Sequence, residues 1–149
     1  MFKKIAVATD GSKLSLKAAS KGMELAKLFH AELKIVYVID QRVFFFPHEV
    51  QELTAENPYF SILETLRSNA QSVLDSLEKE AGRDGLKIET FIREGSVIDE
   101  IVKFVAQNKA DILVMGAHGQ TGEMRGIVGS TTQALVASIP ASMLIVKDK

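Results

Sequence analysis

The sequence contains no cysteine and no tryptophan, and only three prolines among its 149 residues. Without cysteine the chain has no disulfide, no thiolate metal ligand, no iron–sulfur cluster and no cysteine nucleophile. Charge of one sign is also scarce, because 18 Lys and Arg stand against 19 Asp and Glu. So balanced a chain lacks the basic surface that sequence-independent binding of DNA or RNA requires, and we expect no nucleic-acid partner.

Long apolar runs are missing as well. No stretch approaches the roughly 18 uncharged apolar residues that would span a bilayer. The start of the chain, Met1–Ile5, resembles the charged beginning of a signal peptide, but the apolar run that follows is short and Asp10 interrupts it. We therefore expect a cytoplasmic protein without membrane contact, folded as a single domain over residues 1–149.

Short apolar runs alternate with amphipathic patterns. The runs predict five strands, at 5–9, 33–39, 86–93, 112–115 and 143–146. Several are continuous and rich in β-branched residues, which is typical of strands covered on both faces of a parallel sheet. Apolar residues spaced three and four apart predict helices around 18–29, 63–81, 97–105 and 129–139. This alternation predicts an α/β fold of βαβ units, whose ligands bind beyond the carboxyl ends of the strands.

Two local features qualify this pattern. Ser96 and Asp99 have the spacing of a capping box at the start of the third helix. Residues 40–60, by contrast, have no clear periodicity and contain the aromatic run Phe44–Pro47. An irregular insert of this length often forms a lid or a partner surface. Alternatively, its phenylalanines pack beneath the loop and close one end of the core.

A glycine-rich connection follows the fourth predicted strand. Gly116 lets another group approach the backbone, Gly119 permits a tight turn, and Gly129 precedes a helix whose N–H groups favour phosphate. The hydroxyls of Ser130, Thr131 and Thr132 stand at the same helix start, and Arg125 adds a positive charge. The alternative is that the glycines only shape a loop and the hydroxyls only cap a helix. The whole arrangement favours anion binding, although it is neither a Walker P-loop nor a dinucleotide fingerprint.

Asp10, after the first predicted strand, is the second candidate. If strands one and four are neighbours, Asp10 and Gly116 approach the same crevice. A carboxylate there could accept hydrogen bonds from ribose hydroxyls or help to hold a divalent cation beside phosphates. The alternative is that Asp10 or Ser12 caps the following helix.

The spacing Gly116-x2-Gly119-x9-Gly129-Ser130 matches G-x2-G-x9-G-S/T, the nucleotide motif of the universal stress protein family. The segments 7–12, 36–40, 111–116 and 140–146 also resemble strands of that family. The resemblance implies a five-stranded parallel sheet in the order 3-2-1-4-5 with helices on both faces. It also implies the ATP-binding branch of the family.

The resemblance further implies which residues contact ATP. Asp10 would bind the ribose, the Val38 main chain would read the adenine edge, and Thr9 would line the site. Met115 and Gly116 would pack along the ribose and α-phosphate. The phosphates would be held by Gly119, Gly129, Ser130, Thr131 and Thr132. His118 lies where family members often carry a histidine, and we expect it to position the loop rather than to catalyse.

Three functions follow from these features. We expect a regulatory module whose bound ATP biases a dimer or the surface for an unidentified protein partner. Whether Mg²⁺ or Mn²⁺ accompanies the nucleotide stays open. The alternative is a slow ATPase or phosphotransferase, for which the sequence offers no clear general base beyond Asp10. A flavodoxin-like electron carrier would need a Ser/Thr-rich phosphate loop after the first strand, where 10–13 is too short and charged.

The last predicted strand, Met143–Val146, bears on assembly. An apolar strand at the edge of a sheet invites pairing with another chain. Members of the family commonly dimerise through this strand, so the resemblance implies a homodimer. The alternative is that the insert or a helix covers the edge.

Overall fold

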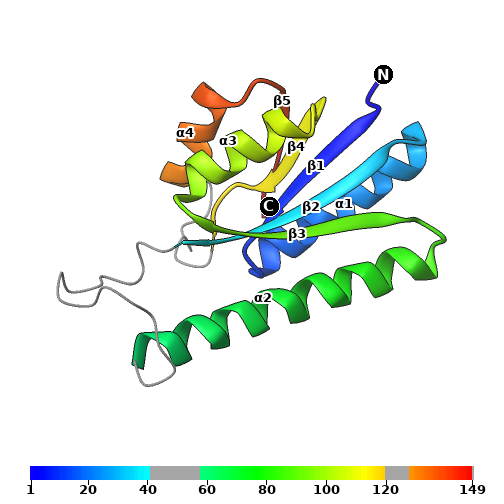
Figure 1. Ribbon diagram of the computed structural model, residues 1–149. Helices are drawn as coiled ribbons and strands as arrows, with labels where there is room; N and C mark the ends of the chain where they lie inside the picture. The colour runs from blue at the N-terminus through cyan, green and yellow to red at the C-terminus, as the bar shows by residue number, and fades with distance from the viewer. Residues whose placement is uncertain (41–57, 120–127, 149) are drawn as a thin grey trace.

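The computed structural model describes residues 1–40, 58–119 and 128–148. Five parallel strands form one sheet in the order β3-β2-β1-β4-β5, as the resemblance implies (Figure 1). The strands are β1 (Lys4–Thr9), β2 (Glu32–Asp40), β3 (Ile88–Gly95), β4 (Ile112–Gly116) and β5 (Ser142–Val146). The chain is a single α/β domain, and its central strand β1 has neighbours on both sides.

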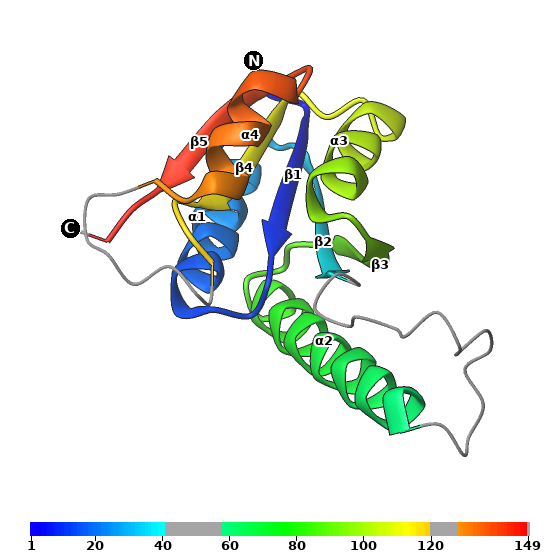
Figure 2. The same cartoon turned by 90° about the vertical axis from the view of Figure 1, so that its left-hand side faces the viewer.

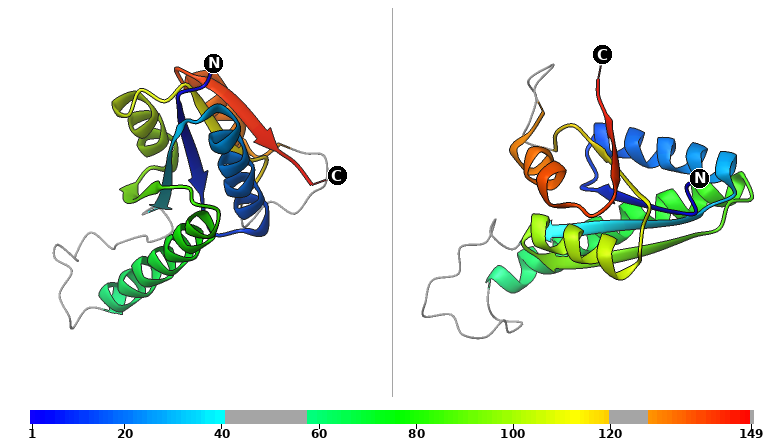
Figure 3. Two further views of the ribbon diagram at one scale, coloured as in Figure 1. Left: turned by 90° about the vertical axis from the view of Figure 1, so that its right-hand side faces the viewer. Right: turned by 90° about the horizontal axis from the view of Figure 1, so that it is seen from above.

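Four helices cover the two faces of the sheet. They are α1 (Lys13–Phe29), α2 (Pro58–Arg83), α3 (Val97–Gln107) and α4 (Ser130–Ser138). Helices α1 and α2 share one core cluster, whereas α3 and α4 share the cluster on the opposite face. In the left-hand view of Figure 3, α3 and α1 lie on opposite sides of the central strands.

The side-chain alternation of β1 explains why both faces are apolar. Ile5 and Val7 lie in the cluster beneath α1 and α2, while Ala6 and Ala8 lie in the cluster beneath α3 and α4. Phe104 of α3 fills that second cluster and is 1% exposed. Removing such a side chain from a core costs about 3–5 kcal/mol of stability. The two cores therefore hold the sheet rigid, and with it the position of the strand ends.

The observed elements differ from the predicted ones mainly at their ends. The insert predicted at 40–60 begins and ends inside regular structure, because Asp40 closes β2 and Pro58 opens α2. Residues 41–57, with the phenylalanine run, lie outside the described residues. Within the described ranges, no helix combines the length and the apolar character that a membrane crossing needs.

The capping box predicted at the start of α3 does not form. Ser96 occupies the N-cap position, but its side chain makes no capping hydrogen bond. Asp99 and Glu100 lie in the first turn of α3 and place negative charge at the positive end of the helix dipole. The prediction was right about where the helix begins and wrong about the capping hydrogen bond.

Candidate functional site

The connection after β1 is held together by its own side chains. The hydroxyls of Thr9 and Ser15 share a hydrogen bond of 2.8 Å, and the Gly11 N–H donates to Thr9 Oγ1 at 3.2 Å. Ser12 Oγ accepts from the Ser15 N–H at 3.3 Å and caps α1, as one of the two predicted alternatives holds. Thr9 is 5% exposed, and its hydroxyl is used in hydrogen bonds within this connection.

Tyr37 fixes the backbone of Asp10. Its hydroxyl donates to the Asp10 carbonyl at 3.0 Å, and its ring lies beside Gly11, whose φ of +82° favours glycine. Burial of the Tyr37 hydroxyl, followed by the nearby charge of Asp10, raises the pKa of Tyr37 above its ordinary value of 10.0. Tyr37 therefore stays protonated at neutral pH and remains a hydrogen-bond donor.

The two distant candidate stretches meet at the Asp10 carboxylate. Asp10 Oδ1 accepts a hydrogen bond of 2.9 Å from the Ser12 N–H. Asp10 Oδ2 lies so close to Gly119 that a Cβ on this glycine would overlap it. A side chain at position 119 would have to displace the Asp10 carboxylate. The contact brings the loop after β4 against the end of β1, as the sequence predicts.

The first turn of α4 is attached to the end of β4. The Gly129 N–H donates to the Ala117 carbonyl at 2.7 Å, and Thr132 Oγ1 donates to the Gly116 carbonyl at 3.2 Å. Gly116 itself lies beneath α1, where a Cβ would be 3.1 Å from Leu14 Cγ. Thr132 is 2% exposed, so its hydroxyl joins the helix to the strand and does not face a ligand. Ser130 is exposed and Thr131 is half-buried.

The N-terminus of α4 has main-chain donors that the helix itself does not satisfy. Gly129 is the N-cap and provides no side-chain cap, and the first turn contains no acidic residue. The first intrahelical bond runs from the Gln133 N–H to the Gly129 carbonyl at 3.0 Å. The N–H groups of residues 130–132 therefore have no partner within the helix. Together with the helix dipole, they form a site suited to an anion.

The strands beside β1 extend past its paired residues at this end of the sheet. β1 pairs with β2 only as far as Tyr37 and with β4 only as far as Val114. Val38 and Met115 come one residue later on either side of β1, and each is 8% exposed. The main chain of Val38 therefore extends past the end of β1, where the sequence predicts the crevice. In Figure 2 the β1 arrow points toward the end of the molecule at which α4 begins.

The two remaining predicted residues lie in the loop after β4. His118 is half-buried and contacts the region of Gly129, since a Cβ on Gly129 would be 3.6 Å from His118 Cβ. His118 therefore packs against the N-terminus of α4. Arg125 lies outside the described residues.

Two residues that hold the site are absent from the prediction. Ser15 anchors Thr9, and Tyr37 anchors Asp10, both through hydrogen bonds. The position of Ser15, three residues after a serine that precedes a helix, is the signal that could have indicated it. Nothing in the pattern of β2 distinguishes Tyr37 from an ordinary core residue.

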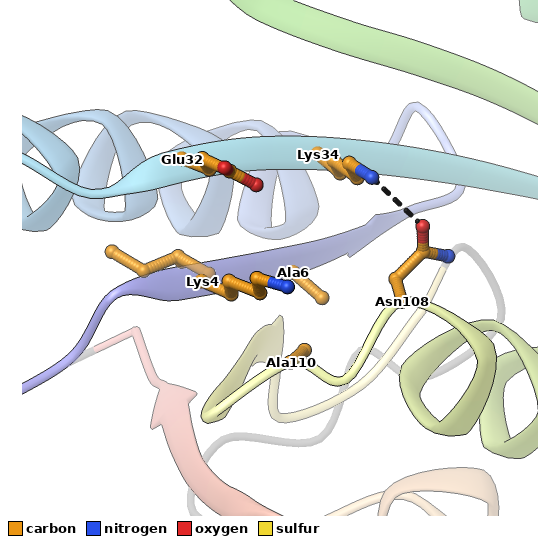
Figure 4. Close-up of a pocket in the computed structure, with 7 residues that line it drawn as sticks. Lys4, Ala6, Glu32, Lys34, Asn108 and Ala110 are labelled. Atoms are coloured by element: carbon orange, nitrogen blue, oxygen red, sulfur yellow. Dashed lines mark hydrogen bonds between the residues drawn. The ribbon is translucent and has the colours of Figure 1, made fainter.

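A small hollow lies at the opposite end of the sheet, far from these residues (Figure 4). It has a volume of about 10 Å³, which is room for about one water molecule. Lys34 Nζ donates to Asn108 Oδ1 there at 3.0 Å and ties β2 to the end of α3. The size of the hollow and this internal bond indicate a structural contact.

Known proteins resemble this chain over its whole length. The universal stress protein family matches residues 1–147. Universal stress protein MJ0531 of Methanocaldococcus jannaschii is 37% identical over 147 residues, which cover 99% of this chain and 83% of that protein. The solved structure of MJ0577, a universal stress protein of the same organism, superposes with a TM-score of 0.81 at 29% identity and covers 100% of this chain and 98% of its own.

A further universal stress protein, solved in complex with cAMP, has a TM-score of 0.70 at 22% identity, with 98% of this chain and 97% of that chain covered. At this identity the likeness concerns the fold, which is the same five-stranded arrangement. The match of the family to nearly every residue and the identity to MJ0531 lead to one conclusion. The chain belongs to the universal stress protein family.

Proposed function

We propose that this chain is a cytoplasmic member of the ATP-binding branch of the family and that bound ATP modulates a dimer or a partner surface. The observation that supports this most directly is one loop with two contacts: Gly119 lies against the Asp10 carboxylate, and His118 lies against Gly129 at the uncapped N-terminus of α4. An anion-binding helix end and a hydrogen-bond acceptor for ribose are the two parts that a nucleotide requires. The cAMP bound to a structural relative supports an adenine nucleotide as the ligand class.

The proposed binding mode follows the order of the strand ends. The N–H groups of residues 130–132, together with Gly119 and Gly129, hold the phosphates. Asp10 accepts from the ribose, and the Val38 main chain contacts the adenine edge. Met115 and Gly116 pack along the ribose and α-phosphate, His118 supports the loop, and Arg125 adds positive charge.

A divalent cation is proposed only together with the nucleotide. Within the described part of the chain, no three His, Asp or Glu side chains form a metal-binding group. Mg²⁺ or Mn²⁺ would therefore take most of its ligands from phosphate oxygens and water, with Asp10 as the nearest carboxylate.

Binding is favoured over efficient catalysis. Phosphoryl transfer needs a group that orients the attacking water or hydroxyl. Among the described residues of the crevice, the carboxylate is Asp10, and its Oδ1 already accepts from the Ser12 N–H. A slow ATPase or phosphotransferase remains the alternative.

We propose a homodimer through the edge strand β5. In the described residues this strand pairs with β4 alone. Leu144 on β5 is 37% exposed, and Val136 on the neighbouring α4 is 56% exposed. Sedimentation of the full chain and of a Leu144→Glu variant tests this, and a wild-type protein that is monomeric at tens of micromolar would contradict it (about the range of weak association).

The experiment for the ligand is mass analysis of small molecules released from the freshly purified, denatured protein, followed by calorimetric titration with ATP. We expect ATP in the released fraction and binding with about one site per chain. A protein that releases no nucleotide and shows no heat of binding with ATP, ADP or cAMP would overturn the proposal.

A further inference from the structure

Arg93 lies beside the end of the crevice where the adenine is proposed to bind. It is the register partner of Val38 across the β2–β3 pair. Neighbouring strands are about 4.8 Å apart, so a planar group against the Val38 main chain also borders β3. Figure 1 shows that β3 is the edge strand beside β2 and that α3 covers this face.

The alternation of β3 places Arg93 on the side of the sheet that contains the site. Phe91, two residues earlier, packs in the cluster of α3 and α4, which also contains Val38 and Met115. Ile92, between them, packs against the cluster of α1 and α2 on the other face. Side chains two residues apart in a strand share a face. Arg93 and Val38 therefore border the same layer.

The Arg93 guanidinium rests on an aromatic platform. Its Cζ is 5.2 Å from the centre of the Phe91 ring. Phe91 in turn meets Phe104 edge to face, with ring centres 5.2 Å apart. Because Phe104 is 1% exposed, this stack continues into the core. The contact with Phe91 restricts the Arg93 side chain and so reduces the entropy that a second stacking partner would cost.

The donors of Arg93 are largely unused. Its Nη1 donates to the Ile92 carbonyl at 3.2 Å, and among the described residues no carboxylate forms an ion pair with it. Arg67, at the same end of the sheet on the other face, is the opposite case. It pairs with both Glu94 and Glu64. Arg67 is thus neutralised by its neighbours, whereas Arg93 keeps a half-buried positive charge.

We propose that Arg93 stacks on the base of the bound nucleotide and gives the site a preference for purines. This inference rests on the proposed function, since it assigns a contact of the same site. The guanidinium lies between the Phe91 ring and the base, with one flat face toward each. Stacking of this kind favours the larger π-surface of a purine over a pyrimidine.

The test compares three ligands, ATP, CTP and inorganic tripolyphosphate, by calorimetry on the full chain. Arg93→Met keeps an unbranched stem over Phe91 but removes the guanidinium. We expect it to weaken ATP binding about tenfold, to lower the preference for ATP over CTP, and to leave tripolyphosphate unchanged. Arg93→Lys keeps the charge without the planar group and is expected to fall between the two.

The control is Arg83→Met at the far end of α2, an exposed arginine in the last turn of that helix. It should bind all three ligands as the wild type does. If Arg93→Met binds ATP with wild-type affinity, or loses all three ligands equally, the stacking contact is overturned while the proposed function stands. If the wild type binds no nucleotide, the proposed function and this inference both fail. Thermal unfolding of each variant shows whether the fold is intact.

Discussion

The N-termini of α1 and α4 lie at the same end of the sheet, but they are capped differently. α1 begins after Ser12, whose side chain accepts from the Ser15 N–H. α4 begins after Gly129, which provides no side chain for this purpose. The first turn of α1 is therefore capped by its own sequence, whereas in the described residues the first turn of α4 has no side-chain cap.

α3 provides a third case. Its N-cap serine makes no side-chain hydrogen bond, but Asp99 and Glu100 in the first turn balance the helix dipole. Of α1, α3 and α4, α4 is the one with neither device. The phosphate site proposed above therefore lies at the one of these three helix ends that has neither a side-chain cap nor an acidic first turn.

The strongest test of this difference is to give α4 a side-chain cap. Gly129→Asp places a carboxylate where it accepts from the first N–H groups of the helix and repels phosphate. A Cβ at position 129 has ordinary room, with its nearest neighbour, the Ala117 carbonyl oxygen, at 3.4 Å. We expect ATP affinity to fall about a hundredfold or more, a loss of about 2.8 kcal/mol, while stability in urea stays equal or rises by about 0.5 kcal/mol.

Gly129→Ala is the matched control for that variant, because it adds the Cβ without the carboxylate. It should retain ATP binding within a few-fold. Equal affinity of the Gly129→Asp variant and the wild type, measured by calorimetry, would refute phosphate binding at α4.

Asp10 tests the other half of the crevice. Asp10→Asn retains an acceptor for the Ser12 N–H and so preserves the turn. Loss of the charge should weaken ATP about tenfold, because hydrogen bonds to charged groups are the stronger ones. Inorganic tripolyphosphate, which has no ribose, should bind as well as before or better. Titrations in which both ligands lose affinity equally would assign Asp10 a different role.

Ser12 represents the capped helix. Ser12→Ala removes the side-chain acceptor for the Ser15 N–H and should cost about 1 kcal/mol of stability, as N-cap substitutions do. Urea denaturation measures this cost, and ATP affinity should change less than twofold. A large loss of ATP affinity without a loss of stability would mean that the end of α1 also belongs to the ligand site.

Asp111 lies at the opposite end of the sheet and provides a comparison with Asp10, because its hydrogen bonds stabilise the fold. Its Oδ2 accepts from the N–H groups of Lys3 and Lys4, both at 2.8 Å. These two hydrogen bonds lower the pKa of Asp111 below its ordinary value of 3.8. Its stabilising contribution is therefore present above about pH 4 and is lost as the pH falls through the lower folded-state pKa.

Thermal unfolding of the wild type and Asp111→Asn between about pH 2 and 6 measures this small effect. The wild type should be the more stable of the two at the upper end, and the difference should disappear at the lower end. ATP affinity should be the same in both proteins. A difference in stability that does not depend on pH would contradict the assignment.

The sequence predicts the sheet and the helices well, because both faces of the sheet are apolar and the helical stripes are regular. It also predicts that Asp10 and the loop of Gly119 approach each other. It could not show that the Thr132 hydroxyl turns inward to the Gly116 carbonyl, since a serine or threonine at a helix start has the same pattern in either role. The capping box failed for the same reason, because its spacing does not decide whether the Ser96 side chain forms the bond.

The donors at the start of α4 belong to the main chain, and every amino acid except proline supplies the same group. An alanine scan across positions 130 and 131 would therefore leave this part of the site in place and would underestimate it. Proline at 130 or at 131 removes one main-chain donor. Its effect on ATP affinity would measure how much that donor contributes to binding.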